Sequence, residues 1–176
     1  MRVKYFGLAV GVWSLCLSSV SAWSAPLEAP RNVKAEAATP RSAELSSRAA
    51  SAEMAGDPQD ALKLAEKTIA ANPRDPWGYY DKAIALAHLT RVDEALQAYS
   101  AAEGFFAPSD LWGRSIAIYG RAHALEQAGR CAEAKSEFER YAAFVRERDP
   151  KSADMATRYA ADCRSPATLA PKSARP

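Results

Sequence analysis

The sequence is poor in the side chains that enzymes use for chemistry. Only two of its 176 residues are histidines, His88 and His123. A metal site needs three or four ligands within reach, and no cysteine or carboxylate group with ligand spacing accompanies them. The sequence also has no Gly-x-Ser-x-Gly elbow, no Cys/His arrangement for nucleophilic attack and no glycine-rich phosphate loop. We therefore expect no enzyme activity, no cofactor and no small-molecule substrate.

Long apolar runs are also missing, apart from one near the N-terminus. A basic start (1–4) precedes an apolar run (5–17), and the segment then ends in the cleavage motif Val20-Ser21-Ala22 or Ala22-Trp23-Ser24-Ala25. This order predicts a secretory signal peptide over residues 1–25, cleaved after Ala22 or Ala25. The alternative is an uncleaved membrane anchor, but the run is shorter than the ~20 apolar residues that a span needs. Cys16 follows a leucine, so it does not resemble the lipidated cysteine of a lipoprotein.

Without the signal, the chain has no excess of positive or negative charge. The signal carries Arg2 and Lys4 and no acid, so 21 of the 23 basic side chains remain beside 21 acidic ones. A neutral chain gives no electrostatic reason to bind nucleic acid or an anionic membrane surface. We expect neither partner, and no stable membrane insertion after cleavage.

Cysteine is scarce, with three in the whole chain. Cys16 belongs to the signal, which leaves Cys131 and Cys163. Two cysteines in an exported chain are more often paired than free, because the compartment is oxidising. No Cys-x-x-Cys motif or activating base favours a redox role.

Two flanking segments lack an apolar period. Residues 26–41 contain Pro26, Pro30 and Pro40 among Ala, Glu and Lys, and residues 164–176 contain three prolines among Ala, Ser and basic residues. We interpret the first segment as a disordered linker and the second as a disordered tail, because neither has enough apolar side chains to bury.

Between the flanks the sequence repeats itself. The stretches GDPQDALKLAEKTIAANP, TRVDEALQAYSAAEGFFAP and GRCAEAKSEFERY share a turn, an acid and then an alanine. The aligned residues Ala61, Ala95 and Ala134 are 34 and 39 positions apart. A period in the thirties with helical patterning predicts a helical repeat architecture. The longer interval predicts about five extra residues near positions 104–113, in a bulged loop.

A second helical stretch precedes each copy, at about residues 43–55, 77–89 and 115–128. Each contains a small residue where two helices must approach, namely Ala49, Ala83 and Ala122. Asp-Pro pairs supply helix start signals before several of these helices. A last helix, at about residues 151–163, has no second arm. The repeating unit is therefore helix, turn, helix, and the fold class is all-α.

These residues carry a resemblance to the tetratricopeptide repeat family. The second copy matches at Ala83, Leu86, Ala95, Tyr99, Ala102 and Pro108, and the third at Ala122, Leu125, Gly129, Ala134 and Phe138. The first copy is more irregular, with matches at Ala49, Gly56, Ala61 and Pro73 and with Ala65 in place of an aromatic residue. The resemblance implies a right-handed solenoid of about three helical hairpins plus a C-terminal capping helix, over residues 42–163.

The resemblance also implies a non-enzymatic module for protein–protein interaction, which binds a peptide or partner segment in a concave groove lined by the first helix of each unit. Helical spacing places candidates on two of these helices: Trp77, Tyr80, Ile84 and His88, then Tyr119, His123 and Glu126. The three large aromatic residues would be anchors, and the histidines and Glu126 would add polar selectivity. An alternative for Trp77 is that it fills the core between helices.

Two other function classes stay open. A structural or assembly subunit of an envelope complex would dock through its loop and end surfaces, with an apolar contact from Phe105, Phe106, Leu111 and Trp112. The alternative for the two phenylalanines is that they are tucked under the neighbouring helices. The third class is an accessory domain of an enzyme. Nothing in the sequence resembles the paired basic clamp with which cytosolic members of the family bind acidic C-termini.

The resemblance also implies where the protein is located and how its two remaining cysteines are arranged. Exported repeats of this kind are mainly bacterial, so we expect a periplasmic or secreted protein. In the resembled stack, the second helix of a unit lies antiparallel beside the first helix of the next. Cys131 would then face Cys163, within the ~4.4–6.8 Å Cα separation of a disulfide. We expect a structural disulfide that fastens the last helix.

Overall fold

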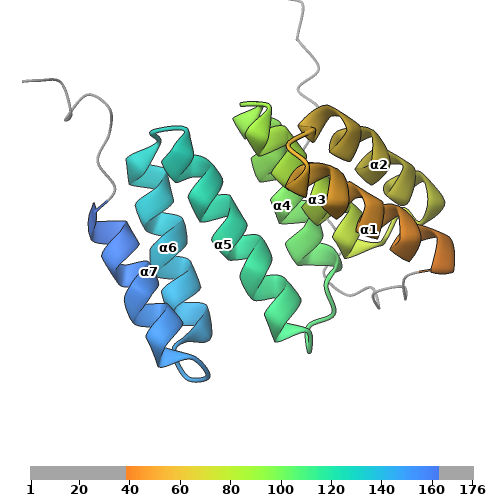
Figure 1. Cartoon of the computed structure of the whole chain (residues 1–176). Helices are drawn as coiled ribbons and strands as arrows, with labels where there is room; N and C mark the ends of the chain where they lie inside the picture. Colours follow the sequence, from red (N-terminus) through yellow and green to blue (C-terminus); the bar gives the residue numbers. More distant parts are fainter. Residues whose placement is uncertain (1–38, 163–176) are drawn as a thin grey trace, which may run out of the picture.

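The computed structural model describes residues 39–162 (Figure 1). The predicted signal peptide, most of the predicted linker, the predicted tail and Cys163 lie outside the described residues. Within residues 39–162 the regular structure is entirely helical, and no strand is present. The seven helices are α1 (Pro40–Met54), α2 (Pro58–Ala71), α3 (Pro76–His88), α4 (Val92–Phe105), α5 (Leu111–Gln127), α6 (Cys131–Val145) and α7 (Pro150–Asp162). The predicted all-α fold is confirmed.

Most of the helices begin at polar side chains that satisfy free backbone N–H groups. Thr39 and Ser42 form a reciprocal capping box at the start of α1, which begins at Pro40, two residues upstream of the predicted domain start. Asp57 and Asp75 accept hydrogen bonds from the first turns of α2 and α3, where a proline follows each of them. Asp149 plays the same part for α7 by accepting from the Ser152 N–H. Local sequence therefore sets the helix starts.

The turn inside each helical pair passes through one left-handed residue. Gly56, Thr90 and Gly129 have φ values of 76°, 60° and 71°. A left-handed residue just after a helix allows the last carbonyl groups to be satisfied, and glycine is the residue that adopts it without steric cost. The second unit uses threonine at this position, so its turn carries backbone strain that the other two units avoid.

Small residues let the paired helices pack closely. The six alanines that the repeat alignment singled out are Ala49, Ala61, Ala83, Ala95, Ala122 and Ala134, and all are 0% exposed. Larger side chains fill the space around them, including Leu86 and Tyr99 in the second unit and Phe138 in the third. Helix α7 covers the third unit with Ala153, Ala156 and Ala160. The predicted hairpin units and capping helix are confirmed.

The extra residues of the third unit form a helical turn, so the predicted bulged loop at 104–113 is wrong. Helix α5 has 17 residues whereas α3 has 13, and Gly104 and Gly113 both lie inside helices. Asp110 starts α5 by accepting a hydrogen bond of 2.8 Å from the Gly113 N–H. The ring of Phe106 packs directly on Gly113, where an added Cβ would lie 2.4 Å from a ring carbon. The glycine thus lets the connection stay short.

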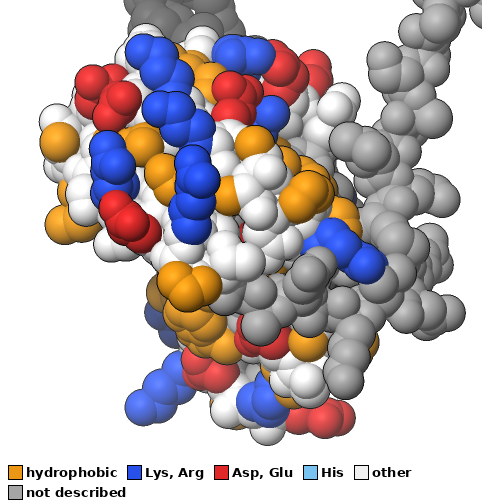
Figure 2. Space-filling view, turned by 90° about the vertical axis from the view of Figure 1, so that its right-hand side faces the viewer, with side chains coloured by type: hydrophobic (Ala, Val, Ile, Leu, Met, Phe, Trp, Pro, Cys, Tyr) orange, Lys and Arg blue, Asp and Glu red, His pale blue; other side chains and the backbone are white. Residues whose placement is uncertain are grey.

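The stack has two different long faces. Helix α3 contacts both α1 and α5, whereas the backbones of α2, α4 and α6 do not approach one another. Closer packing of the first helices curves this part of the stack toward them. We call the surface of α1, α3 and α5 the first-helix face and the surface of α2, α4 and α6 the second-helix face. At the α1/α2 end, Lys and Arg lie among Asp, Glu and small apolar areas (Figure 2). None of the described helices is long and apolar enough to cross a membrane.

Candidate functional site

Four of the predicted groove residues follow one another along α3. Trp77, Tyr80 and Ile84 are half-buried, and the His88 side chain at the end of the helix is 51% exposed. The edge of the Tyr80 ring meets Trp77 at a centroid distance of 5.8 Å and Tyr99 at 5.9 Å. Burial raises the pKa of the Tyr80 hydroxyl, and the neighbouring Asp81 charge acts in the same direction. These aromatic residues belong partly to the core and partly to the first-helix face.

Trp77 joins the first-helix face to the predicted loop surface. Its ring contacts buried Phe106 at 5.2 Å and Trp112 at 5.7 Å. Phe105 packs against Tyr79, so both phenylalanines are tucked in. Trp112 remains 65% exposed in the first turn of α5, next to exposed Leu111. One continuous aromatic surface thus runs from Trp112 through Trp77 to Tyr80. No pattern in the sequence indicated this junction, because it depends on the extra turn of α5.

Two of the three predicted residues of α5, Tyr119 and His123, belong to a second aromatic group, and the third, Glu126, contacts His123. The Tyr119 and His123 rings meet edge to face at 4.4 Å, and Phe138 and Tyr159 lie 5.1 and 5.4 Å from His123. The His123 Nδ1 atom lies 2.8 Å from a Glu126 carboxylate oxygen. Burial raises the pKa of Tyr119, helped by the nearby tyrosines. Because Tyr159 belongs to α7, the capping helix borders this group.

Polar contacts between α1 and α3 were not foreseen from the sequence. The Ser42 hydroxyl donates to Asp75 at 2.7 Å and the Ser46 hydroxyl donates to Asp81 at 2.5 Å. Near the other end, the His88 Nδ1 atom lies 2.6 Å from a Glu53 carboxylate oxygen.

Asp81 is the most unusual member of this polar set. Asp81 is 6% exposed, and burial raises the pKa of its carboxyl group to about 6. The Ser46 hydrogen bond opposes this shift, whereas the charges of Asp75 and Glu53 add to it. Its hydrogen-bond partner Ser46 lies 35 residues away in sequence, so only the folded stack brings the two side chains together.

The two histidines do not share a site, and neither of them shares one with Cys131. His88 and His123 each pair with a different glutamate, and residues 39–162 contain no group of three metal-ligating side chains. Cys131 is the first residue of α6. Cys163 lies just beyond the described residues, so the disulfide between them stays a prediction.

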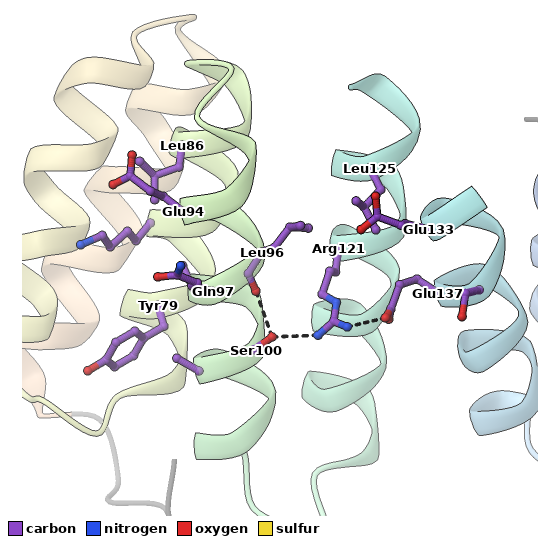
Figure 3. A pocket seen from close by; sticks show the side chains of 14 residues that line it. Tyr79, Leu86, Glu94, Leu96, Gln97, Ser100, Arg121, Leu125, Glu133 and Glu137 are labelled. Carbon is purple, nitrogen blue, oxygen red and sulfur yellow. Dashed lines mark hydrogen bonds and ion pairs between the residues drawn. The ribbon is translucent and has the colours of Figure 1, made fainter. Parts of the chain in front are cut away.

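The second-helix face carries a pocket that the sequence did not indicate. Its volume is about 490 Å³, and α3, α4, α5 and α6 supply its walls (Figure 3). The Arg121 guanidinium crosses its floor, donating at 2.8 Å to the Ser100 hydroxyl on α4 and pairing with Glu137 on α6. Ion pairs close both ends: Arg130 with Asp93, and Arg140 with Glu103. Polar side chains therefore bridge the gap between α4 and α6.

Comparison with known proteins agrees with the fold. Residues 52–112 match the family model described as tetratricopeptide repeat. The match runs from the end of α1 to the start of α5, and the same pairing of helices continues to α7. No curated protein matches the chain. Tetratricopeptide repeats generally mediate protein–protein interaction. Residues 52–112 thus match the tetratricopeptide repeat family, and the seven stacked helices of residues 39–162 support a tetratricopeptide repeat fold beyond the matched segment.

Proposed function

We propose that the chain is a non-enzymatic interaction module that binds an extended segment of a partner protein on its first-helix face. The observation that carries the proposal is the continuous aromatic surface of Trp112, Trp77 and Tyr80. Large aromatic side chains that are partly exposed and already held by neighbours lose little conformational freedom on binding. Such residues supply much of the binding energy at protein interfaces.

Charged and polar side chains on the rest of the face would give the aromatic surface a direction, with an apolar end and a polar end. His88 and Glu53 lie at the end of α3 opposite to Trp77, and His123 and Glu126 lie on α5. A partner segment that crosses from Trp112 toward His88 would meet aromatic side chains first and charged groups last. This gradient favours a segment with an apolar residue at one end and polar residues at the other.

Binding to a peptide library tests this proposal. We would select peptides from a random library displayed on phage against the purified chain, then measure the dissociation constant of a selected peptide. Replacing the exposed Trp112 by alanine should weaken binding about tenfold or more. Gln97→Ala, on the second-helix face, is the matched control and should leave the affinity unchanged. The proposal is wrong if no peptide is selected, or if Gln97→Ala weakens binding while Trp112→Ala does not.

A second candidate is a structural subunit that docks on a folded partner. The exposure of Leu111 and Trp112 at the end of the stack favours it. Trp112→Ala would then break a stable complex in the producing cells, whereas substitutions of Tyr80 or His88 would leave that complex intact. Substitution of His88 by alanine separates the two candidates, because only a segment lying along α3 reaches it.

We also propose that the chain is exported to the periplasm or secreted. The support is the basic, apolar and small-residue order of positions 1–25. N-terminal sequencing of the protein from the exported fraction should give Trp23 or Pro26 as the first residue. A protein that retains Met1 in the cytoplasm would contradict export.

A further inference from the structure

The pocket on the second-helix face has the size of a ligand site. Its volume of about 490 Å³ lies within the ~300–1,000 Å³ that is usual for such sites. It is open because the backbones of α4 and α6 stand apart above α5. The ion pairs at its two ends fix its length, since each joins α4 to residues at or near α6. The first-helix face lies on the opposite side of the stack.

The pocket has leucine side chains on its floor beside the Arg121 guanidinium, and carboxylates at its edges. Leu86, Leu96 and Leu125 contribute to the floor. At the mouth, the side chains of Glu94 and Glu133 are 52% and 55% exposed, so each carboxylate can accept further hydrogen bonds although an arginine already binds it. An occupant with one apolar side chain and a nearby cation therefore fits this lining.

The chain itself contains a segment of this chemistry. Residues 164–176 read RSPATLAPKSARP, with Leu169 as their only large apolar residue. Arg164, Lys172 and Arg175 supply three cations, and no acid opposes them. Prolines on both sides of Leu169 disfavour a helix and favour an extended segment, which lowers the entropy cost of docking.

The segment starts close enough to reach the pocket. Helices α6 and α7 form an antiparallel pair, so α7 ends beside the first turns of α6 (Figure 1). Glu133, Ser136 and Glu137 from the first half of α6 line the pocket. The segment has to pass around one helix, whose diameter is ~10–12 Å. The seven residues from position 163 to Leu169 span up to about 23–25 Å when extended.

We propose that residues 164–176 dock into this pocket of their own chain, with Leu169 on the leucine floor and Lys172 at the carboxylates of Glu94 and Glu133. Docking fills the gap between α4 and α6, which is otherwise bridged only by side chains. The docked segment also prevents other proteins from binding to the second-helix face. The proposal does not depend on the binding site assigned to the first-helix face.

Site-specific photo-crosslinking in the full chain tests the docking. A benzoylphenylalanine replaces Gln97, which lines the pocket, and a matched variant carries it at Gln59, an exposed glutamine of α2. Both positions are exposed, and circular dichroism checks that both variants remain helical. Irradiation of the Gln97 variant should link α4 to a residue between 164 and 176 of the same chain, as peptide mass spectrometry would show. The Gln59 variant should not form this link.

Tail variants then test the chemistry. Leu169→Asp should reduce the Gln97 crosslink about tenfold, because it removes the side chain that the floor buries. Ala167→Asp adds the same charge without removing the leucine, and should reduce the yield much less. A Gln97 crosslink that is no stronger than that of Gln59, that survives Leu169→Asp, or that joins only two separate chains would overturn the proposal.

Discussion

At the scale of single residues, the turn of the second unit stands out. Thr90 is held at φ 60°, where the equivalent turns have Gly56 and Gly129. A residue with a Cβ costs about 1–2 kcal/mol in this region. The three units therefore share one turn geometry, but the second forms it at a cost in stability.

Replacing Thr90 by glycine should therefore stabilise the protein. We expect the free energy of unfolding to rise by about 1 kcal/mol, after allowing for the greater freedom of glycine in the unfolded chain. Urea denaturation measures it. The control is Thr157→Gly, the same substitution inside α7, which should lower the free energy of unfolding by a similar amount. If both substitutions lowered the free energy of unfolding by the same amount, Thr90 would not be strained.

Asp81 makes stability depend on pH. Its pKa is raised to about 6 in the folded chain, above its ordinary value of 3.8, so folding favours the protonated carboxyl group. This contribution is complete below about pH 4 and is lost as the pH rises through 6. The difference corresponds to up to about 3 kcal/mol.

Asp81→Asn, which cannot ionise, should remove this pH dependence. The variant should be more stable than the native chain at pH 7.5, and the difference should shrink toward pH 4.5. Denaturation at the two pH values measures it, with Asp154→Asn as the control because that carboxylate is 67% exposed. A constant difference between the Asp81→Asn variant and the native chain at both pH values would contradict the assignment.

At the scale of helices, the extra turn of α5 depends on one close contact. Gly113→Ala would place a Cβ within 2.4 Å of the Phe106 ring and displace it from beneath Trp77. We expect the free energy of unfolding to fall by about 1–3 kcal/mol, although alanine is the better helix former. Gly104→Ala, at an exposed position of α4, should be neutral or stabilising. Stabilisation by Gly113→Ala would show that the contact is not needed.

The capping helix α7 provides a further prediction for the cysteines. If Cys131 and Cys163 are joined, the closed loop stabilises the fold by on the order of 3–4 kcal/mol in the chain-entropy model. Cys163→Ser should lower the unfolding temperature of the native protein, and a reducing agent should not lower it further. Alkylation of both cysteines in the unreduced protein would rule out the bond.

Helix positions were predictable from the sequence, because their causes are local. Asp-Pro starts and buried alanines such as Ala83 act within one helix or one hairpin. The extra turn of α5 was not predictable, since it requires Phe106 to fold back onto Gly113. The same holds for Asp81, whose hydroxyl partner lies on another unit. Spacing placed Trp77 on the first-helix face, but only its contacts with Phe106 and Trp112 show that it is both core and surface.

At the scale of the whole molecule, the two faces differ in what they offer. The first-helix face presents aromatic side chains that the core already holds in place. The second-helix face has a leucine floor between ion pairs. A repeat protein with two such faces can bind a partner on one and be covered by its own chain on the other.

The most direct test of the central claim is crosslinking from the first-helix face in cells that produce the protein. A photoreactive residue at His88 should yield a discrete adduct with another protein, and the adduct should weaken when Trp112→Ala is added. The same residue at Lys63, an exposed position of α2, should not yield it. An adduct that forms from Lys63 and not from His88 would contradict the account.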